Sequence, residues 1–212
     1  MTYRVKEIFP TLQGEGAHSG RASVFLRFSG CNLWNGRLED RDTATCRFCD
    51  TDFRGIDGEN GGEYAEAHTL AGAVASLWLG STGKPYVVVT GGEPLLQLDR
   101  ALIDALHDRG FEIAIETNGT LPAPDGVDWI CVSPKEGARW IQKSGHELKV
   151  VWPQGFELSE LAKLDFQYRF LQPMDDPDPV QRADNILSAT RTCMTNPVWR
   201  LSLQTHKLIG IP

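Results

Sequence analysis

The sequence predicts an α/β protein built as a partial, open β/α barrel of mainly parallel strands. Segments with strand, loop and helix character follow one another repeatedly along the 212 residues, which is the order typical of a parallel sheet with crossover helices. Residues 86–90 form a continuous run of strand-forming side chains, as in a strand buried on both faces. A complete barrel typically needs about 250 residues, and too few helices are evident for one. An open barrel is therefore expected.

Two strands are expected ahead of the first cysteine. Residues 4–9 alternate between polar and apolar side chains, and residues 23–28 form a second strand-like run. The glycine-containing segment 10–16 between them predicts a loop whose backbone can approach a ligand closely. Residues 32–45, which follow Cys31, are mostly polar and charged. They predict an inserted surface loop.

The remainder of the chain continues the strand and helix pattern. Residues 95–109 carry leucines at helical spacing, and Gly110 follows where a helix C-cap is expected. Asp178 and Pro179 predict the start of a helix, because proline is favoured at the first helical position. The other expected elements are a loop over 57–62, helices over 70–79 and to about 194, and strands over 111–116, 127–132, 148–152, 167–171 and 199–203.

Composition and charge narrow the class of protein. With 41% hydrophobic and 23% charged residues, the chain can bury one core, and no composition break divides it, so one domain over 1–212 is expected. It has no run of 18 apolar residues and its first ten lack the apolar core of a signal peptide. These features predict a cytoplasmic protein without a membrane span. A net charge of −7 argues against a nucleic-acid partner.

Three cysteines form the most informative cluster. Cys31, Cys46 and Cys49 are spaced C-x14-C-x2-C. A closed zinc site takes four ligands and a redox pair takes two, whereas an iron–sulfur cube on three cysteines leaves one iron open to another ligand. Disulfides are disfavoured, because nothing else in the sequence indicates secretion. From this stretch alone, zinc completed by His18 and an iron–sulfur cluster remain equal alternatives.

Polar residues follow the ends of nearly all expected strands. In a parallel β/α fold this is the face where active sites form. Residues 91–94 offer backbone amides and a carboxylate to a ligand with carboxylate and ammonium groups, or they simply start a helix. Glu116 and Asn118 offer acceptors to ribose hydroxyls. The strand-end residues are Gln13, Gly14, Glu15, Cys31, Thr90, Gly91, Gly92, Glu93, Glu116, Thr117, Asn118, Ser133, Pro134, Lys135, Gln172, Pro173, Met174, Asp175, Gln204, Thr205 and His206.

The three-cysteine motif, followed by Gly-Gly-Glu-Pro after a buried strand, resembles the radical S-adenosylmethionine superfamily. There three cysteines hold a [4Fe-4S] cluster whose fourth iron is chelated by S-adenosylmethionine, so the resemblance favours iron–sulfur over zinc. The closer similarity, over almost the whole chain, is to the 7-carboxy-7-deazaguanine synthase family of the queuosine pathway. It rests on Leu12-Gln-Gly-Glu-Gly16, Phe48-Cys-Asp-Thr51, Glu116-Thr-Asn-Gly119, Ser133-Pro-Lys135 and His206-Lys207.

One feature departs from the superfamily pattern, which usually spaces its cysteines C-x3-C-x2-C. Eleven extra residues separate Cys31 from Cys46, and loops accept such length cheaply. The remaining cysteines, Cys131 and Cys193, lie in an expected apolar strand and an expected helix. They are expected to pack as small hydrophobes.

The resemblance implies a role for each matching position. Cys31, Cys46 and Cys49 would hold the [4Fe-4S] cluster, and Thr51 would bind Mg²⁺, with capping of the local turn as its alternative. The positions similar to S-adenosylmethionine contacts are Phe48, Asp50, Gly92, Glu116, Asn118, Ser133, Pro134, Lys135, Gln172, Pro173, Met174 and Asp175. The positions similar to substrate contacts are Leu12, Gln13, Gly14, Glu15, Arg27, Thr90 and Pro212.

Two of the substrate positions also have a chemical rationale. Arg27 could hold a carboxylate in fork geometry, although a strand-end arginine is as often a surface charge. The chain ends in the apolar segment 208–212, which either frays or folds back. If it folds back, the carboxylate of Pro212 could take paired, charge-assisted hydrogen bonds from a pterin.

The function that the resemblance implies is a radical lyase. It converts 6-carboxy-5,6,7,8-tetrahydropterin to 7-carboxy-7-deazaguanine and releases ammonia, using the cluster, S-adenosylmethionine and Mg²⁺. A flavodoxin-like reductant would supply the electron, and a homodimer is compatible with the family. A glycyl-radical-enzyme activase is the alternative within the superfamily, and a non-catalytic zinc-binding module is the alternative from another class.

Overall fold

A computed structural model of the chain describes residues 2–212. The strands are β1 (Tyr3–Leu12), β2 (Ala22–Phe28), β3 (Gly62–Tyr64), β4 (Tyr86–Gly91), β5 (Glu112–Thr117), β6 (Trp129–Val132), β7 (Ser144–Trp152), β8 (Asp165–Pro173) and β9 (Arg200–Leu201). The α-helices are α1 (Ala67–Ser76), α2 (Arg100–His107), α3 (Leu158–Leu161), α4 (Pro179–Thr195) and α5 (Thr205–Ile209), and the 3-10 turns are η1 (Gly16–His18), η2 (Leu38–Thr43) and η3 (Pro94–Leu96).

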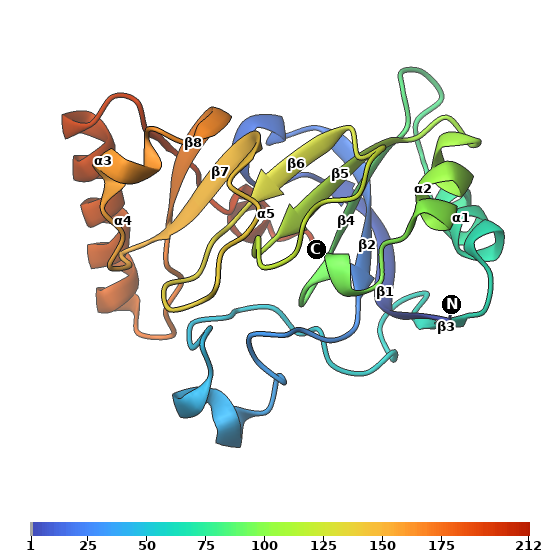
Figure 1. Ribbon diagram of the computed structural model, residues 1–212, viewed down its shortest axis with the longest axis horizontal. Coiled ribbons are helices and arrows are strands. Elements are labelled where there is room, and N and C mark those ends of the chain that lie inside the picture. Colours follow the sequence, from blue (N-terminus) through green and yellow to red (C-terminus); the bar gives the residue numbers. More distant parts are fainter. Residues whose placement is uncertain (1) are drawn as a thin grey trace.

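The strands form one nine-stranded sheet in the order β3-β1-β2-β4-β5-β6-β7-β8-β9 (Figure 1). β1 runs antiparallel to β2 and β3, whereas every pair from β2 to β9 is parallel. Within residues 2–212 no ladder joins the edges β3 and β9. The expected open, mainly parallel β/α barrel is confirmed.

Helices cover the outside of the sheet at its two ends. α1 and α2 lie together at one end, and α3 and α4 lie at the other (Figure 1). Leu102 and Leu106 of α2 are fully buried and pack with strand residues such as Val87 and Ile113. A second group around Leu148 and Trp199 fills the space beneath α4. The apolar periodicity of the helices thus faces the sheet, as the sequence predicts.

The element boundaries differ from expectation where side chains cap the backbone. The single helix expected over 95–109 divides into η3 and α2, because the Asp99 carboxylate accepts the Leu102 amide at 3.0 Å and starts a new helix. β1 continues through residues 10–12, which were expected to form a loop. Pro10 is opposite Val24 of β2, and β3 pairs only with the first residues of β1. At Pro10 the edge of β1 that faces away from β2 therefore has no ladder partner, and proline is accepted there.

Other elements were missed or misplaced by the sequence pattern. The expected loop over 57–62 ends in the short strand β3, and the helix expected over 70–79 begins earlier, at Ala67. α3 and α5 were not expected, since each is too short for a periodic pattern. α4 occupies the expected place, with Asp178 accepting the Val180 amide at 3.0 Å and Pro179 in its first turn.

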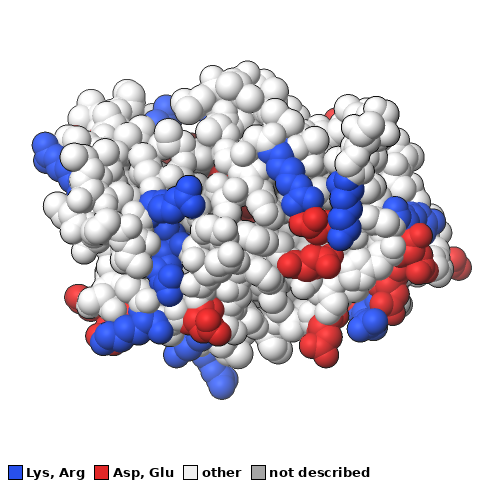
Figure 2. Space-filling view, turned by 90° about the horizontal axis from the view of Figure 1, so that it is seen from above, with Lys and Arg blue, Asp and Glu red and all other residues white. Residues whose placement is uncertain are grey.

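The inserted segment 32–45 forms a surface excursion that contains η2. It lies below the sheet, on the side toward which the arrowheads of β5 and β6 point (Figure 1). The face seen in Figure 2 carries Lys and Arg next to Asp and Glu rather than a continuous basic patch. None of the helices in residues 2–212 is long and apolar enough to cross a membrane.

Candidate functional site

A cavity of about 370 Å³ opens at the C-terminal ends of the parallel strands. This volume lies in the range of small-molecule sites, about 300–1,000 Å³. Of the positions that the resemblance assigns to the cluster, the cofactor, Mg²⁺ or the substrate, all line this cavity except Pro134 and Met174. Of the other strand-end residues, Glu93 and Thr205 do not line it. Strand ends and loops far apart in the sequence therefore meet at one site, as parallel β/α topology dictates.

The thiol wall of the cavity consists of Cys31, Cys46 and Cys49. A hydrogen bond between the Cys46 and Cys49 thiols raises the pKa of Cys46 and lowers the pKa of Cys49 to about 6. Burial raises the pKa of Cys31, whose Sγ accepts the Leu33 amide at 3.4 Å. The Lys135 ammonium acts on Cys46 and Cys49 in the opposite direction to burial, lowering their pKa values. The thiolate form of Cys49 is thus already favoured, and the Lys135 ammonium adds to this preference.

The chemistry of the donor set suits a [4Fe-4S] cube, which takes each of three thiolates at a separate iron. In residues 2–212 no group of three or more His, Cys, Asp or Glu side chains is placed to bind one metal ion. Gly92 packs directly against this wall, because a Cβ there would lie 2.6 Å from the Cys31 Cβ and 2.3 Å from the Gly30 oxygen. The close approach explains why glycine is required next to the thiols.

His18 does not complete a zinc site with these thiols. Its Nδ1 lies 2.8 Å from the Tyr86 hydroxyl, and its ring centroid lies 4.0 Å from that of Trp129. It lines a separate small cavity of about 10 Å³ and not the large one. The contacts of His18 with Tyr86 and Trp129 indicate a packing role for this histidine.

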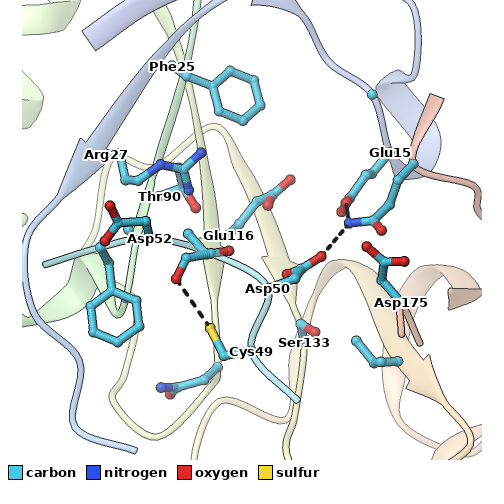
Figure 3. A pocket seen from close by; sticks show the side chains of 18 of the residues that line it. Glu15, Phe25, Arg27, Cys49, Asp50, Asp52, Thr90, Glu116, Ser133 and Asp175 are labelled. Atoms are coloured by element: carbon cyan, nitrogen blue, oxygen red, sulfur yellow. Dashed lines mark hydrogen bonds between the residues drawn. The ribbon is translucent and has the colours of Figure 1, made fainter. Parts of the chain in front are cut away.

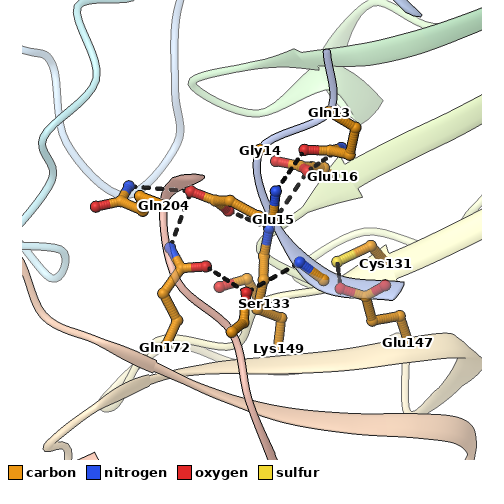
Figure 4. A network of polar contacts seen from close by, with 12 residues as sticks. Gln13, Gly14, Glu15, Glu116, Cys131, Ser133, Glu147, Lys149, Gln172 and Gln204 are labelled. Carbon is orange, nitrogen blue, oxygen red and sulfur yellow. Dashed lines mark hydrogen bonds and ion pairs between the residues drawn. The ribbon is translucent and has the colours of Figure 1, made fainter. Parts of the chain in front are cut away.

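The floor of the cavity is a buried polar layer, here called the polar floor: Gln13, Glu15, Glu116, Lys149, Gln172 and Gln204 (Figure 4). Its centre is Lys149 of β7, which pairs with Glu15 and with Glu116, the latter at 3.3 Å. Only 4% of the Lys149 side chain is exposed. Burial would lower its pKa, but the carboxylates of Glu116 and Glu15 hold it well above the usual range. The ammonium is therefore charged.

Glu15 connects this floor to the C-terminal part of the chain. It accepts hydrogen bonds from Gln172 at 3.0 Å and from Gln204 at 2.9 Å. Burial would raise its pKa, but the Lys149 charge and the hydrogen bonds hold the pKa below its usual range. Gln13 donates to Glu116 at 3.1 Å. The loop after β1 thus crosses to β5, β7 and β8 and closes the interior of the open sheet.

Two residues expected at the ligand have their acceptors occupied by the protein. Glu93 is fully buried and accepts from the Thr117 hydroxyl at 2.7 Å and the Asn118 amide at 2.8 Å. It does not line the cavity, so the segment 91–94 presents its glycines rather than its carboxylate. The Asn118 amide group bonds Asn32 at 3.0 Å and accepts from Thr120 at 2.7 Å. Both residues fix the loops that surround the site.

On the opposite wall, Arg27 points into the cavity beside Thr90 (Figure 3). Its Nε donates to Glu7 at 2.7 Å, and only 16% of the side chain is exposed. The pair with Glu7 fixes the guanidinium, and its terminal nitrogens remain available on the cavity side. Arg27 is therefore a partly buried, oriented cation and not a surface charge.

The C-terminal segment is ordered along the rim. Lys207 of α5 donates to Asp50 at 2.6 Å and to Asp175 at 2.7 Å. Both carboxylates have lowered pKa values: burial would raise each pKa, but hydrogen bonds from Lys207 overcome this. The terminal oxygen of Pro212 accepts the Thr11 hydroxyl at 2.6 Å, and Pro212 lines the cavity. Of the two alternatives for the chain end, the folded-back arrangement is confirmed.

Sequence reasoning missed Lys149, the most buried cation of the site. The available signal was Glu147 and Lys149 two residues apart in an apolar strand, which places both on one face of β7. Lys6, paired with Asp52 at 2.8 Å and Asp57 at 2.9 Å, also lines the cavity and was missed. Nothing in its local sequence distinguishes it from a surface lysine.

Comparisons with known proteins agree with this arrangement. Residues 43–143 match the Radical SAM superfamily. The chain is 60% identical over 212 residues to a 7-carboxy-7-deazaguanine synthase of Bradyrhizobium diazoefficiens, and 60% identical over 213 residues to one of Caulobacter vibrioides, with 100% of each chain covered. The crystal structure of QueE from Escherichia coli is similar, with a TM-score of 0.66 and 28% identity over 97% of this chain and 95% of that one.

Proposed function

The chain belongs to the 7-carboxy-7-deazaguanine synthase family of radical SAM enzymes, and we propose that it converts 6-carboxy-5,6,7,8-tetrahydropterin to 7-carboxy-7-deazaguanine with release of ammonia. This makes it a carbon–nitrogen lyase of the queuosine pathway. Full-length identity to synthases argues against the glycyl-radical-enzyme activase and the zinc-binding module, neither of which is among these relatives.

One observation carries the proposal: a single cavity has a wall of three cysteines and a floor of paired charges. A radical enzyme needs its iron–sulfur group and its polar substrate in one enclosed space, so that the reactive species meets only the substrate. The thiol wall provides the first and the polar floor with Arg27 provides the second. When bound, the [4Fe-4S] cluster and S-adenosylmethionine supply the radical that removes a hydrogen atom from the substrate.

The residues of this chain would hold the two cofactors as follows. Cys31, Cys46 and Cys49 ligate three irons. Gly92, which packs closely against Cys31, would present its backbone to the amino-acid part of S-adenosylmethionine. Lys135, whose Nζ lies 2.8 Å from the Ser133 hydroxyl, places a positive charge beside the thiolates. The remaining positions proposed for this cofactor are Phe48, Asp50, Glu116, Asn118, Ser133, Pro134, Gln172, Pro173, Met174 and Asp175.

The substrate would lie between the polar floor and the rim. Arg27 matches its carboxylate in charge, and its pairing with Glu7 orients the guanidinium. The pterin ring offers N–H donors, which suit carboxylates such as Glu15 and the chain terminus at Pro212. Leu12, Gln13, Gly14 and Thr90 complete the proposed contacts.

We place the Mg²⁺ ion at Thr51. Thr51 lines the cavity and its hydroxyl makes no hydrogen bond with residues 2–212, which supports a ligand role over a turn-capping role. Mg²⁺ keeps several waters and uses few protein oxygens, often with help from a substrate oxygen. Replacing Thr51 by Ala should weaken the dependence of the rate on Mg²⁺ and leave the iron content unchanged.

Two partners and a location remain proposals. The cluster needs one electron from outside, and a flavodoxin-like protein is the proposed donor in the cytoplasm.

α4 exposes Val180, Leu187 and Met194 at seven-residue intervals, with 67%, 46% and 78% of each residue accessible. This apolar stripe supports a homodimer, which sedimentation of the purified protein tests directly.

The decisive experiment is turnover. Protein reconstituted with iron and sulfide under anaerobic conditions should convert the pterin in the presence of S-adenosylmethionine, reductant and Mg²⁺, with one ammonia released per product. A protein that binds the cluster and cleaves S-adenosylmethionine but leaves the pterin unchanged would overturn the proposed substrate. A colourless protein with zinc in place of iron would overturn the proposal that this protein is a radical enzyme.

A further inference from the structure

The inserted segment 32–45 folds back onto the loop that carries two of the three thiols. Arg41, in η2, donates from Nη1 to the Arg47 oxygen at 2.7 Å and to the Cys49 oxygen at 3.0 Å. One guanidinium nitrogen therefore joins both sides of the short turn that contains Cys46 and Cys49. Hydrogen bonds from a charged donor are stronger than those from a neutral one.

A buried aromatic side chain holds this guanidinium in place. The Arg41 Cζ lies 4.1 Å from the ring centroid of Trp34, a cation–π distance. Trp34 is only 7% exposed, its Nε1 donates to the Arg37 oxygen at 3.0 Å, and its ring meets Phe53 edge-on at 5.6 Å. A long, flexible side chain is thus fixed on a rigid support, which reduces the entropy lost when it binds the turn.

The ends of the excursion are also tied together. The amides of Thr45 and Cys46 approach the Leu33 oxygen at 3.2 and 3.5 Å. Residues 33–46 consequently form a closed loop with Trp34 at its base and Arg41 bound to the backbone of the Cys46–Cys49 turn. An insertion that served only as a spacer would need neither contact.

We propose that the insertion is a brace, and that Arg41 is a positioning residue that holds the Cys46–Cys49 turn in its cluster-binding shape before any cluster is present. The inference rests on the proposed function only in taking these thiols as cluster ligands. Arg41 acts through the backbone of the turn and touches neither substrate nor thiol sulfur.

The first arm of the test uses the protein without cluster, so it does not depend on activity. Hydrogen exchange of peptides covering residues 45–51 is compared in wild type, Arg41→Gln and Arg41→Lys. Loss of two charge-assisted bonds should speed exchange there about tenfold or more in Arg41→Gln. Arg41→Lys keeps the charge but not the planar fork, and should be intermediate.

The matched control is Arg37→Gln. Arg37 lies in the same excursion and carries the same charge, but its side chain makes no hydrogen bond or ion pair with residues 2–212. Exchange over 45–51 should match that of the wild type. Thermal unfolding of all three variants separates local loosening from global loss of the fold.

The second arm measures the rate at which reconstituted protein loses iron to a chelator. Arg41→Gln should lose iron about tenfold faster than Arg37→Gln, with an unchanged iron content at the start. If Arg41→Gln and Arg37→Gln show equal hydrogen exchange over residues 45–51 and equal rates of iron loss, the proposal that Arg41 braces the turn is wrong. A wild-type protein that takes up no iron would overturn the proposed function, while the exchange arm would still decide on the brace.

Discussion

The thiol wall and the polar floor face each other across one cavity, yet they are built in opposite ways. The thiol wall comes from a single stretch, residues 31–49, and from loop rather than strand. The polar floor collects side chains from the β1 loop, β5, β7, β8 and the start of α5. A ligand set that lies within one loop can be recognised from spacing, whereas a set gathered by the sheet cannot.

The two regions also differ in how their charges are balanced. The floor is self-compensated, because the Lys149 ammonium lies between the Glu15 and Glu116 carboxylates. The thiol wall has no such pairing among its own side chains. The Lys135 ammonium lowers the pKa values of Cys46 and Cys49, and Arg41 binds only the backbone of their turn. We infer that the floor contributes to the stability of the fold, and that the wall depends on its ligand and on the brace.

The largest effect is expected in cluster binding, when one cysteine of the thiol wall is replaced. Replacing Cys31, Cys46 or Cys49 by Ala should abolish cluster binding, measured as iron content and absorbance after reconstitution, while the fold melts as a single transition. The matched controls are Cys131→Ala and Cys193→Ala, each of which should keep the iron and cost about 1–2 kcal/mol of stability. Iron loss in Cys131→Ala as complete as in Cys46→Ala would show that the wall has been assigned to the wrong thiols.

The next largest effect is expected in stability, when Lys149 is removed from the centre of the polar floor. Lys149→Met leaves Glu15 and Glu116 without their buried counter-charge, and breaking such a pair costs about 3–5 kcal/mol. Denaturant unfolding measures the loss. Lys163→Met is the control, since its pair with Glu160 is exposed on both sides and should change stability by less than about 1 kcal/mol. Similar losses in the two variants would mean that the floor adds nothing to the fold.

A smaller effect concerns the rim that joins both regions. Deleting Pro212 removes the terminal carboxylate from its bond with Thr11 and moves the negative charge away from the cavity. The KM for the pterin should rise about tenfold or more, because a charge-assisted contact is lost. Cluster content and S-adenosylmethionine binding should stay unchanged. A C-terminal tag should act in the same direction, whereas kinetics equal to the wild type in both forms would remove the chain end from the site.

The smallest expected effect concerns Glu147, which lies outside the polar floor and lines the separate small cavity of His18. Glu147 is buried, and burial raises its pKa above the ordinary value, although its Oε2 accepts the Ala17 amide at 3.0 Å. In the unfolded chain it loses its proton near pH 4.5. Between that pH and its higher pKa in the folded state, the folded protein holds one more proton, so stability falls as the pH rises.

Replacing Glu147 by Gln should remove this slope. The difference in unfolding free energy between wild type and variant should change by up to about 1.4 kcal/mol per pH unit in that window, in favour of the variant. Urea titrations at several pH values measure it. A difference between wild type and Glu147→Gln that stays constant as the pH rises above 4.5 would mean that the carboxylate is already ionised in the folded protein.

Local patterns were sufficient for much of the molecule. The buried run at residues 86–90, the proline-started helix α4 and the glycines beside the thiols are local properties of the chain, and all were predicted. The division of residues 95–109 was not predicted, because a cap at Asp99 competes with a leucine pattern that continues through it.

The sequence by itself determined the open β/α class, the three-cysteine wall and the face on which the site lies, since these follow from period, spacing and strand order. Only the tertiary structure decided which polar groups serve the site and which serve the fold. It turned Glu93 inward to Thr117 and Asn118, set Lys149 between two carboxylates and brought Arg41 to the backbone of the Cys46–Cys49 turn. The physical reason is that a buried charge is acceptable only when its partners surround it, and those partners lie far apart along the chain until the sheet brings them together.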